Sequence, residues 1–362
     1  MTRPRLAAIV GATGIAGQQF VVALQNHPWF KIARLAASAR SAGKSYRDAL
    51  LDPKSGARRW WCDVEPAADV LNLVVENGDD FDPKGIDLLF SATESEVAQI
   101  QEPKFAREVP VISTASAFRA EADVPLLVPN VSMHLADLLK IQRRNRGWKG
   151  FIAPNPNCTV TGLAITLKPL LDRFGIERVM VTTMQGLSGA GRSPGVPGLD
   201  ILDNIVPYIA KEEEKVEKEL LKIFGTLAGA TVKSHSAIVS ATCTRANVIE
   251  GHTEAVSVSL SKKATVDQVK AALREYPNEM AALKLPSAPK EWIHVHEDPF
   301  RPQPRLDRNR GNGMTTTVGR VREDKVLKNG IKYMLVSHNT KMGAAAGAVL
   351  VAEYLKAKGT IG

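Results

Sequence analysis

Short apolar runs alternate with amphipathic stretches over the first 113 residues of the chain. Residues 6–10 are uniformly apolar and end at a glycine, as expected for a buried strand. Apolar positions then recur with helical spacing over 14–26. Further strands are expected at 31–37, 86–92 and 109–113, and a further helix at 95–107. Because strands that alternate with helices pair through right-handed crossovers, this region predicts a parallel sheet of the Rossmann type.

The pattern changes near residue 150, where strands with alternating polar and apolar positions become frequent. A helix is expected to begin at Cys158, and a loop rich in Gly, Ser and Pro covers 188–197. Strands are expected at 178–184, 235–241, 253–260, 315–321 and 331–338, and helices at 199–205, 211–224 and 342–358. This mixture is typical of an α+β domain with a large mixed sheet.

Together these patterns predict an α/β protein of two domains, which a length of 362 residues allows. Residues 1–155 are expected to form the Rossmann-type domain, which the final segment 340–362 rejoins because its apolar helix must pack on a sheet. Residues 156–339 are expected to form the α+β domain with the large mixed sheet. The composition, 44% hydrophobic and 23% charged, excludes a disordered or fibrous chain.

Composition also bounds the compartment and the partners. Three cysteines, none of them in a CxxC pair, argue against a disulfide framework, and the chain runs straight into its first strand without a signal peptide. The longest apolar stretch, 343–355, is shorter than the roughly 20 residues of a membrane span. With few aromatic residues for base stacking, the net charge of +9 suits anionic small molecules better than nucleic acid. We expect a cytoplasmic protein with neither a nucleic-acid nor a membrane partner.

Three glycines with the spacing GxxGxxG lie between the first strand and the first helix. Gly11, Gly14 and Gly17, with Thr13 and Ile15 among them, permit a tight turn and let the backbone approach a pyrophosphate at the helix N-terminus. A bare match of this kind is a structural turn about as often as a nucleotide loop. Its position directly after an apolar strand favours a dinucleotide.

The end of the second strand distinguishes between the two nicotinamide cofactors. NAD sites usually place an acidic residue there for the ribose 2′-hydroxyl, and this segment has none. It carries Ser38, Arg40, Ser41 and Lys44 instead, whose hydroxyls and cations suit a 2′-phosphate. The alternative is a solvated basic loop; we favour NADP.

Cys158 follows the turn Asn155-Pro156-Asn157 and directly precedes an apolar helical run. At a helix N-terminus, free N–H groups and the helix dipole lower the pKa of a thiol, so we expect a reactive thiolate near neutral pH. Cys62 and Cys243 are interpreted as inert. A thiolate beside a dinucleotide can capture an aldehyde or an activated acyl group and exchange hydride with the cofactor, a reaction that needs a proton shuttle, normally a histidine.

Many segments in the same order resemble the aspartate-β-semialdehyde dehydrogenase family, nearest its archaeal and fungal branch. The matching segments are GATGIAG, SARSAGKSY, DVPLLVPNV, NPNCTVTGL, TMQGLSGAG, PGVPGLDILDNIVPYI, EEEK, TRANVIEGHTE, RPQPRLDR and SHNTKMGAAAGA. The resemblance implies an NADP-dependent enzyme that reduces β-aspartyl phosphate to aspartate semialdehyde, on the route to lysine, threonine and methionine. It also implies a homodimer or homotetramer that associates through the second domain.

The same resemblance implies roles for individual residues. Cys158 matches the nucleophile, a protonated His252 matches the general acid/base, and Gln185 matches the residue that holds the acyl-enzyme. Among the substrate-binding residues, Arg245 matches the one for the carboxylate, Glu212 the one for the amine, and Lys215 and Arg119 those for the phosphate. Asn157 matches a further substrate-binding residue, and Asn339 matches a residue near the nicotinamide. Glu213 is an alternative to Glu212 by one position. Taken alone, the acidic and basic residues of 212–218 are only a charged helix face, and a lone histidine is more often structural.

Two rival functions remain open at this point. Malonyl-CoA reductase shares the fold and also reduces an acyl group captured by a thiolate, but it binds no substrate amine, so Glu212 and Lys215 favour the aspartate derivative. A rival of another class is a catalytically silent NADP-binding sensor. The joint presence of Cys158, His252, Gln185 and Arg245 argues against it.

Two departures from the family pattern and one rival metal site are also considered. Arg192-Ser193 stands where family members usually carry one aromatic residue, and 113–116 lacks an Asn that archaeal and fungal members often have. His294 and His296, with Glu297 beside them, could start a zinc site, but no third and fourth ligands are evident. We expect no metal.

Overall fold

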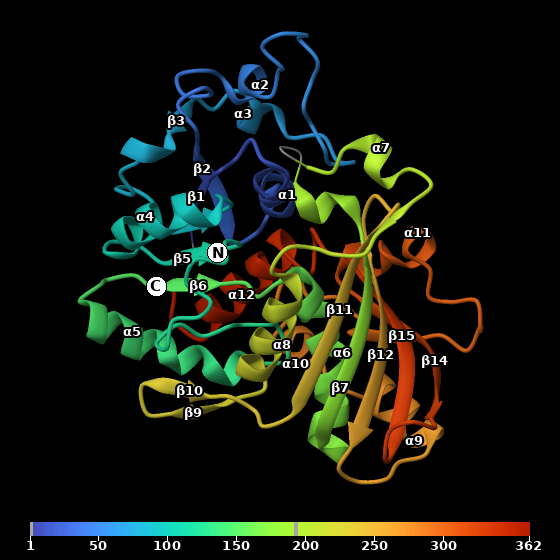
Figure 1. The fold of residues 1–362 in the computed structure, drawn as a ribbon. Coiled ribbons are helices and arrows are strands. Elements are labelled where there is room, and N and C mark those ends of the chain that lie inside the picture. The colour runs from blue at the N-terminus through green and yellow to red at the C-terminus, as the bar shows by residue number, and fades with distance from the viewer. Residues whose placement is uncertain (1–2, 192–194) are drawn as a thin grey trace.

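The first sheet is parallel throughout and is formed by the N-terminal part of the chain (Figure 1). The structure, a computed structural model, describes residues 3–191 and 195–362. The six strands are β1 (Arg5–Val10), β2 (Phe30–Ala37), β3 (Val75–Asn77), β4 (Leu88–Ser91), β5 (Val111–Ser113) and β6 (Ile152–Pro154). Their order, β3-β2-β1-β4-β5-β6, is the Rossmann order, so the predicted parallel sheet is confirmed.

Helices pack around this sheet, and the last of them comes from the C-terminal end of the chain. They are α1 (Ile15–Leu24), α2 (Tyr46–Ala49), α3 (Ala68–Leu71), α4 (Ser95–Ala106), α5 (Leu138–Arg146) and α12 (Ala345–Ala357), with 3-10 turns η1 (Gly78–Asp80) and η2 (Met133–Asp137). Helix α12 contacts α1 and β5. Ten of its thirteen residues are buried, which explains its apolar sequence.

The second sheet has seven strands and is mixed, as predicted. They are β7 (Ile176–Gln185), β8 (Ile205–Val206), β11 (Ile238–Ala246), β12 (His252–Leu260), β13 (Ile293–Val295), β14 (Thr316–Asp324) and β15 (Gly330–Ser337), in the order β13-β14-β15-β12-β7-β11-β8. The pairs β7–β11 and β13–β14 are parallel, and the other pairs are antiparallel. A separate hairpin joins β9 (Thr226–Ala228) to β10 (Thr231–Lys233).

Helix α6 lies on one face of the second sheet, where it contacts β7, β12, β14 and β15 (Figure 1). The helices of this region are α6 (Cys158–Phe174), α7 (Gly198–Ile201), α8 (Glu212–Ile223), α9 (Val266–Arg274), α10 (Glu279–Ala282) and α11 (Pro304–Asp307), with 3-10 turns η3 (Leu187–Ala190) and η4 (Arg310–Gly313). Along β7 the buried positions alternate with exposed ones such as Met180 and Thr182. One face of the sheet is therefore covered and the other is open.

Two predictions for this region are wrong in their boundaries. The helix expected at 199–205 is the single turn α7, because Asp203 adopts a φ of 56° and Ile205 pairs with Ala246 at the sheet edge. The strand expected at 235–241 begins at Ile238 and continues to Ala246, where it runs parallel to β7.

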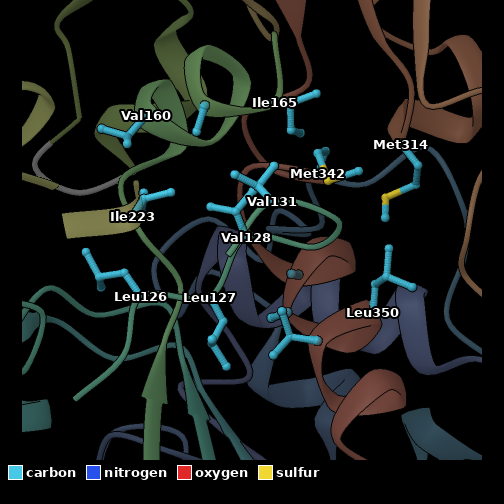
Figure 2. Packing of buried hydrophobic residues seen from close by; sticks show 14 of the residues in the cluster. Leu126, Leu127, Val128, Val131, Val160, Ile165, Ile223, Met314, Met342 and Leu350 are labelled. Carbon is cyan, nitrogen blue, oxygen red and sulfur yellow. The ribbon is translucent and has the colours of Figure 1, made fainter. Parts of the chain in front are cut away.

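The largest cluster of buried apolar side chains is continuous between the two sheets. Figure 2 shows members of this cluster from α6, from α12 and from the connecting segment 126–131 gathered in one region. The shared core keeps the two parts of the chain in a fixed relation, so that residues from both can form one site. Among the helices of the two described ranges, none has the length and apolar character that crossing a membrane requires.

Candidate active site

A cavity of about 1040 Å³ lies at the carboxyl edge of the first sheet, where α/β proteins bind their ligands. Its lining combines residues that follow the strands of the first sheet with residues of the second region. The predicted residues in this lining are Thr13, Gly14, Ile15, Arg40, Ser41, Arg119, Asn157, Cys158, Gln185, Glu212, Lys215, Arg245 and Asn339. Gly11, Gly17, Ser38 and His252 are not part of it. Arg59 and Trp61, which the sequence did not single out, also line the cavity.

The glycine turn at one end of the cavity is packed too tightly for side chains. Gly11 has a φ of +82°, and a Cβ there would lie 2.5 Å from the carbonyl oxygen of Ala92. A Cβ on Gly17 would lie 2.1 Å from the carbonyl oxygen of Gly11. Gly14 is the N-cap of α1, and no side chain caps this helix. The first turn of α1 therefore keeps N–H groups free for an anion such as a diphosphate.

The basic segment after β2 lies beside this turn. Arg40 and Ser41 line the cavity together with Lys44; Ser41 is buried, whereas the two cations are exposed. The carbonyl of Ser38 accepts a hydrogen bond from the Ser41 N–H, which closes the segment into a turn. Two cations and a buried hydroxyl, with no acidic side chain at the strand end, fit a phosphate on the ribose.

At the other end of the cavity, Cys158 begins α6 and lies against His252 at the start of β12. The Cys158 Sγ is 3.1 Å from the His252 Nε2. Asn157 caps the helix, because its side-chain oxygen accepts hydrogen bonds from two main-chain N–H groups, of Thr159 and Val160. The Gly186 N–H donates to the His252 Nδ1 at 3.1 Å. In a neutral imidazole with this bond, the ring hydrogen lies on Nε2 and faces the sulfur.

Burial dominates the acid–base behaviour of this pair. It raises the pKa of the Cys158 thiol to about 12, and the Glu212 carboxylate adds to this effect. Arg245, Arg119 and the Thr159 N–H each act in the opposite direction, but more weakly than burial. Burial and Arg245 also lower the pKa of His252 to about 3. These directions contradict the expected thiolate: without substrate, desolvation outweighs the helix N-terminus and favours a thiol beside a neutral imidazole.

Glu212 is the centre of a buried hydrogen-bond network next to Cys158. Its Oε1 accepts from the Asn157 Nδ2 at 2.8 Å and from the Gln185 Nε2 at 3.2 Å. Lys215 lies one turn further along α8, with its Nζ 3.9 Å from the Glu212 Oε2. Glu213 does not line the cavity and accepts from the main-chain N–H of Cys243. Of the two acidic residues considered, only Glu212 faces the site.

Arg245 and Asn339 complete the walls around the pair. The Arg245 Nη1 donates to the carbonyl of Gly186, the residue whose N–H holds His252. The Asn339 side chain accepts from the Gly251 N–H and donates to the hydroxyl of Ser188. These contacts fix the two side chains at the cavity wall without using all of their donors.

Arg119 reaches the site from the segment after β5, and its partner is Glu219 of α8, which sequence reasoning missed. The Arg119 Nη1 lies 3.1 Å from the Glu219 Oε1, and the Glu219 Oε2 accepts from the Asn157 N–H at 2.6 Å. A signal for Glu219 existed, because it lies seven residues after Glu212 and so on the same helix face.

Glu254 is a second buried acid that the sequence reasoning missed. It lies two residues after His252 on β12, and neither of its carboxyl oxygens has a hydrogen-bond partner among the described residues. Burial, with a smaller effect from Glu212, holds its pKa well above the usual range. Alternation along a strand was the available signal, because it places residues 252 and 254 on the same face.

Segment 113–116, which departs from the family pattern, and the histidine pair considered for zinc both have side-chain partners within the protein. Arg192 and Ser193 lie outside the described residues. In the 113–116 segment, the Ser113 hydroxyl donates to Glu102 and the Ser116 hydroxyl is 2.6 Å from that of Ser95. His296 pairs with Asp307 and His294 with Glu291. Within the described ranges, no group of three or more His, Cys, Asp or Glu side chains could hold a metal ion.

A Rossmann-order sheet whose carboxyl edge faces a cysteine–histidine pair defines an oxidoreductase with a nucleophilic thiol. Family models agree with this class: "Semialdehyde dehydrogenase, NAD binding domain" matches residues 6–138, and "Semialdehyde dehydrogenase, dimerisation domain" matches residues 167–342. The chain belongs to the aspartate-semialdehyde dehydrogenase family.

Similar proteins with this name match along nearly the whole chain. The aspartate-semialdehyde dehydrogenase of Methanothermobacter thermautotrophicus is 45% identical, with 96% of this chain and 97% of the relative covered, and that of Saccharomyces cerevisiae is 42% identical, with 100% of each covered. The crystal structure of the Candida albicans enzyme with NADP has a TM-score of 0.86 at 40% identity, covering 99% of this chain and 100% of that one. Aspartate semialdehyde dehydrogenase II of Vibrio cholerae, complexed with ASA, has a TM-score of 0.75 at 28% identity, covering 98% and 99%.

Proposed function

We propose that the protein is an NADP-dependent aspartate-semialdehyde dehydrogenase. It converts β-aspartyl phosphate to aspartate semialdehyde and phosphate through a thioester on Cys158. The observation that carries this proposal is the 3.1 Å contact between His252 and Cys158, the residue that lines the same cavity as the glycine turn. A thiol that can hold an acyl group thus shares one cavity with a site suited to a dinucleotide.

The bound cofactor supplies the hydride, and this chain supplies its binding site. The turn from Gly11 to Gly17, with Thr13, Gly14 and Ile15, holds the diphosphate at the start of α1. Ser38, Arg40 and Ser41 bind the 2′-phosphate. Asn339 lies near the nicotinamide. The tight backbone packing at the glycines and the free first turn of α1 support the first of these assignments.

Cys158 attacks the acyl carbon of the substrate: the carbon–sulfur bond forms, the bond from the acyl carbon to the phosphate oxygen breaks, and the leaving phosphate takes up the proton that the thiol loses. His252 is the general acid/base of the reaction; its Nε2–H faces the sulfur and can donate to the oxygen that becomes negative in each step. Gln185 holds the acyl group, supported by its place in the cavity wall. The neutral imidazole donates this hydrogen bond from Nε2.

Four charged residues, with Asn157, bind the remaining groups of the substrate. Arg245 binds the α-carboxylate, Glu212 the α-ammonium, and Lys215 and Arg119 the phosphate, and all of them line the cavity. Pairing of the substrate ammonium with Glu212 also removes a charge that raises the pKa of Cys158. This pairing of the ammonium with Glu212 therefore favours formation of the thiolate.

A paired assay tests the proposal. Phosphate-dependent NADP reduction with aspartate semialdehyde is compared with NADPH oxidation by malonyl-CoA, with Cys158→Ala as the control. We expect activity with aspartate semialdehyde only, and none in the variant. Activity with malonyl-CoA alone would assign the protein as a malonyl-CoA reductase, and no activity with either substrate would favour a silent NADP-binding sensor.

The chain contains a semialdehyde dehydrogenase dimerisation domain, and we further propose that it forms a homodimer or homotetramer. The open face of the second sheet supports this, because Met180 and Ile238 are exposed on adjacent strands there. Leu202, Ile205 and Tyr208, near the sheet edge, are each about 60% exposed. Large apolar side chains that are exposed near one another mark an interaction surface.

We also propose domain boundaries for the chain and a cytoplasmic location for the protein. Residues 1–155, rejoined by 340–362, form the NADP-binding domain, and 156–339 form the catalytic and dimerisation domain. The packing of α12 against α1 supports the return of the chain end to the first domain. All three cysteines are free, which is consistent with the reducing cytoplasm.

A further inference from the structure

Helix α8 carries four charged side chains in a line on the face next to the cavity. Glu212, Lys215, Glu219 and Lys222 lie at positions i, i+3, i+7 and i+10, which share one side of a helix. The first two belong to the site already described. The other two contact the segment after β5, on which Arg119 lies.

Glu219 joins the side chain of Arg119 to the turn that precedes the nucleophile. The Arg119–Glu219 ion pair is 3.1 Å long, and both side chains are about 90% buried. Through its other oxygen, Glu219 accepts from the Asn157 N–H at 2.6 Å. The Arg119 Nη2 donates to the carbonyl of Thr114 at 3.0 Å, which fixes the plane of the guanidinium. An ion pair with this burial and these additional bonds orders a side chain far more than an exposed pair does.

Lys222 holds the main chain of the same segment. Its Nζ donates to the carbonyl of Arg119 at 2.8 Å and to the carbonyl of Glu121 at 2.7 Å. Glu219 thus fixes the side chain of Arg119, and Lys222 fixes its backbone. Both residues come from α8, the helix that also presents Glu212 and Lys215 to the substrate. One rigid helix therefore sets the distance between Arg119 and these two substrate-binding residues.

We propose that Glu219 and Lys222 are positioning residues for the phosphate group of the substrate, which act by holding Arg119. The inference rests on the proposed phosphate-binding role of Arg119. It predicts a selective defect, because aspartate semialdehyde can form the thioester and transfer its hydride to NADP before phosphate enters the reaction. Loss of either residue should therefore weaken the binding of phosphate and leave the rate of this first half-reaction unchanged.

The test compares Glu219→Gln and Lys222→Met with Arg119→Gln as a reference. Glu214→Gln is the matched control, since Glu214 is an exposed residue of the same helix with the same change of charge. In Glu219→Gln the amide oxygen can still accept from the Asn157 N–H, while the guanidinium loses its anionic partner. Two quantities are measured: the KM for inorganic phosphate in the steady state, and the rate of first-turnover NADPH formation without phosphate.

We expect both variants to raise the KM for phosphate about tenfold, the scale of one lost charge-assisted hydrogen bond, and to keep the first-turnover rate within about twofold of the wild type. Glu214→Gln should change neither quantity. A KM for phosphate that is unchanged or lowered in both variants, while Arg119→Gln raises it, would overturn the inference and leave the role of Arg119 standing. No effect in Arg119→Gln would overturn that role as well. A first-turnover rate that falls by the same factor as the KM for phosphate rises would show a merely structural role and overturn the inference. If Glu219→Gln does not fold, the result for Lys222→Met alone decides.

Discussion

Cys158 lies between charges that act on its thiol in opposite directions. Glu212 raises the pKa of the thiol and Arg245 lowers it, while burial sets a high starting value. A substrate that places an ammonium beside Glu212 and a carboxylate beside Arg245 changes both contributions at once. The first change favours the thiolate and the second opposes it, so Glu212 is the residue through which the substrate can activate the nucleophile.

Glu212→Gln tests this assignment, because it should make Cys158 more reactive toward an alkylating agent and the enzyme less active. The variant keeps an oxygen for the Asn157 amide but loses the charge, so the pKa of Cys158 should fall. We expect alkylation of Cys158 by iodoacetamide at pH 8 to accelerate by about tenfold for each unit of that fall, and kcat/KM to decrease about tenfold or more. Glu214→Gln serves as the control. Alkylation no faster than in the wild type would contradict the role of the Glu212 charge.

His252 should stay neutral across the working pH range. Burial lowers its pKa to about 3, whereas the unfolded chain binds a proton near the ordinary value of 6.5. The folded state therefore gains stability above that value and loses it as the pH falls toward 3. Nitrogen-15 NMR of histidine-labelled protein should show the hydrogen on Nε2 from pH 5 to pH 9. A titration of this ring near pH 6.5 would contradict the prediction.

At the scale of elements, local chemistry explains where the sequence predicted structure well. Helix α6 begins at Cys158 as expected, because Asn157 caps the two N–H groups that follow. The predicted helix at 199–205 is wrong because a left-handed Asp203 and a pairing with distant Ala246 end it. Neither cause could be seen in that segment alone. By contrast, Glu219 could have been found from helical spacing.

The glycine turn offers a matched pair of substitutions. A Cβ on Gly17 would lie 2.1 Å from the Gly11 carbonyl oxygen, whereas a Cβ on Gly14 would lie 3.5 Å from the same atom. Gly17→Ala should therefore lower the free energy of unfolding by about 1–3 kcal/mol, as overpacking does, and weaken NADP binding. Gly14→Ala should be close to the wild type in thermal unfolding. Equal stability of the two variants would contradict this packing.

Across the whole molecule, burial sets pKa values that the sequence alone could not predict. The position of Cys158 at a helix N-terminus was predicted, but the direction of its pKa shift was wrong, because the shift depends on elements that meet only in the fold. Helix α6 carries the sulfur, strand β12 carries His252 beside it, and the turn after β7 holds the other ring nitrogen of His252. The raised pKa of Glu254 also results from burial, which arises only when the elements meet in the fold.

The open face of the second sheet makes a prediction about assembly. Light scattering should show the wild-type protein as a dimer or tetramer. Replacing both Met180 and Ile238 with Asp would bury two charges in the proposed interface, so we expect this variant to be a monomer. Val326→Asp, at another highly exposed apolar position, should leave the assembly unchanged. A monomeric wild-type protein, or an intact oligomer in the double variant, would contradict the proposed interface.

One measurement tests most directly whether Cys158 carries the acyl group. The protein is mixed with aspartate semialdehyde and NADP without phosphate, NADPH formation is followed in the first turnover, and the quenched protein is examined by peptide mass spectrometry. We expect about one NADPH per subunit, with an aspartyl adduct on the peptide that contains Cys158 and neither signal in Cys158→Ala. An adduct on another residue, or the same NADPH burst in the variant, would contradict it.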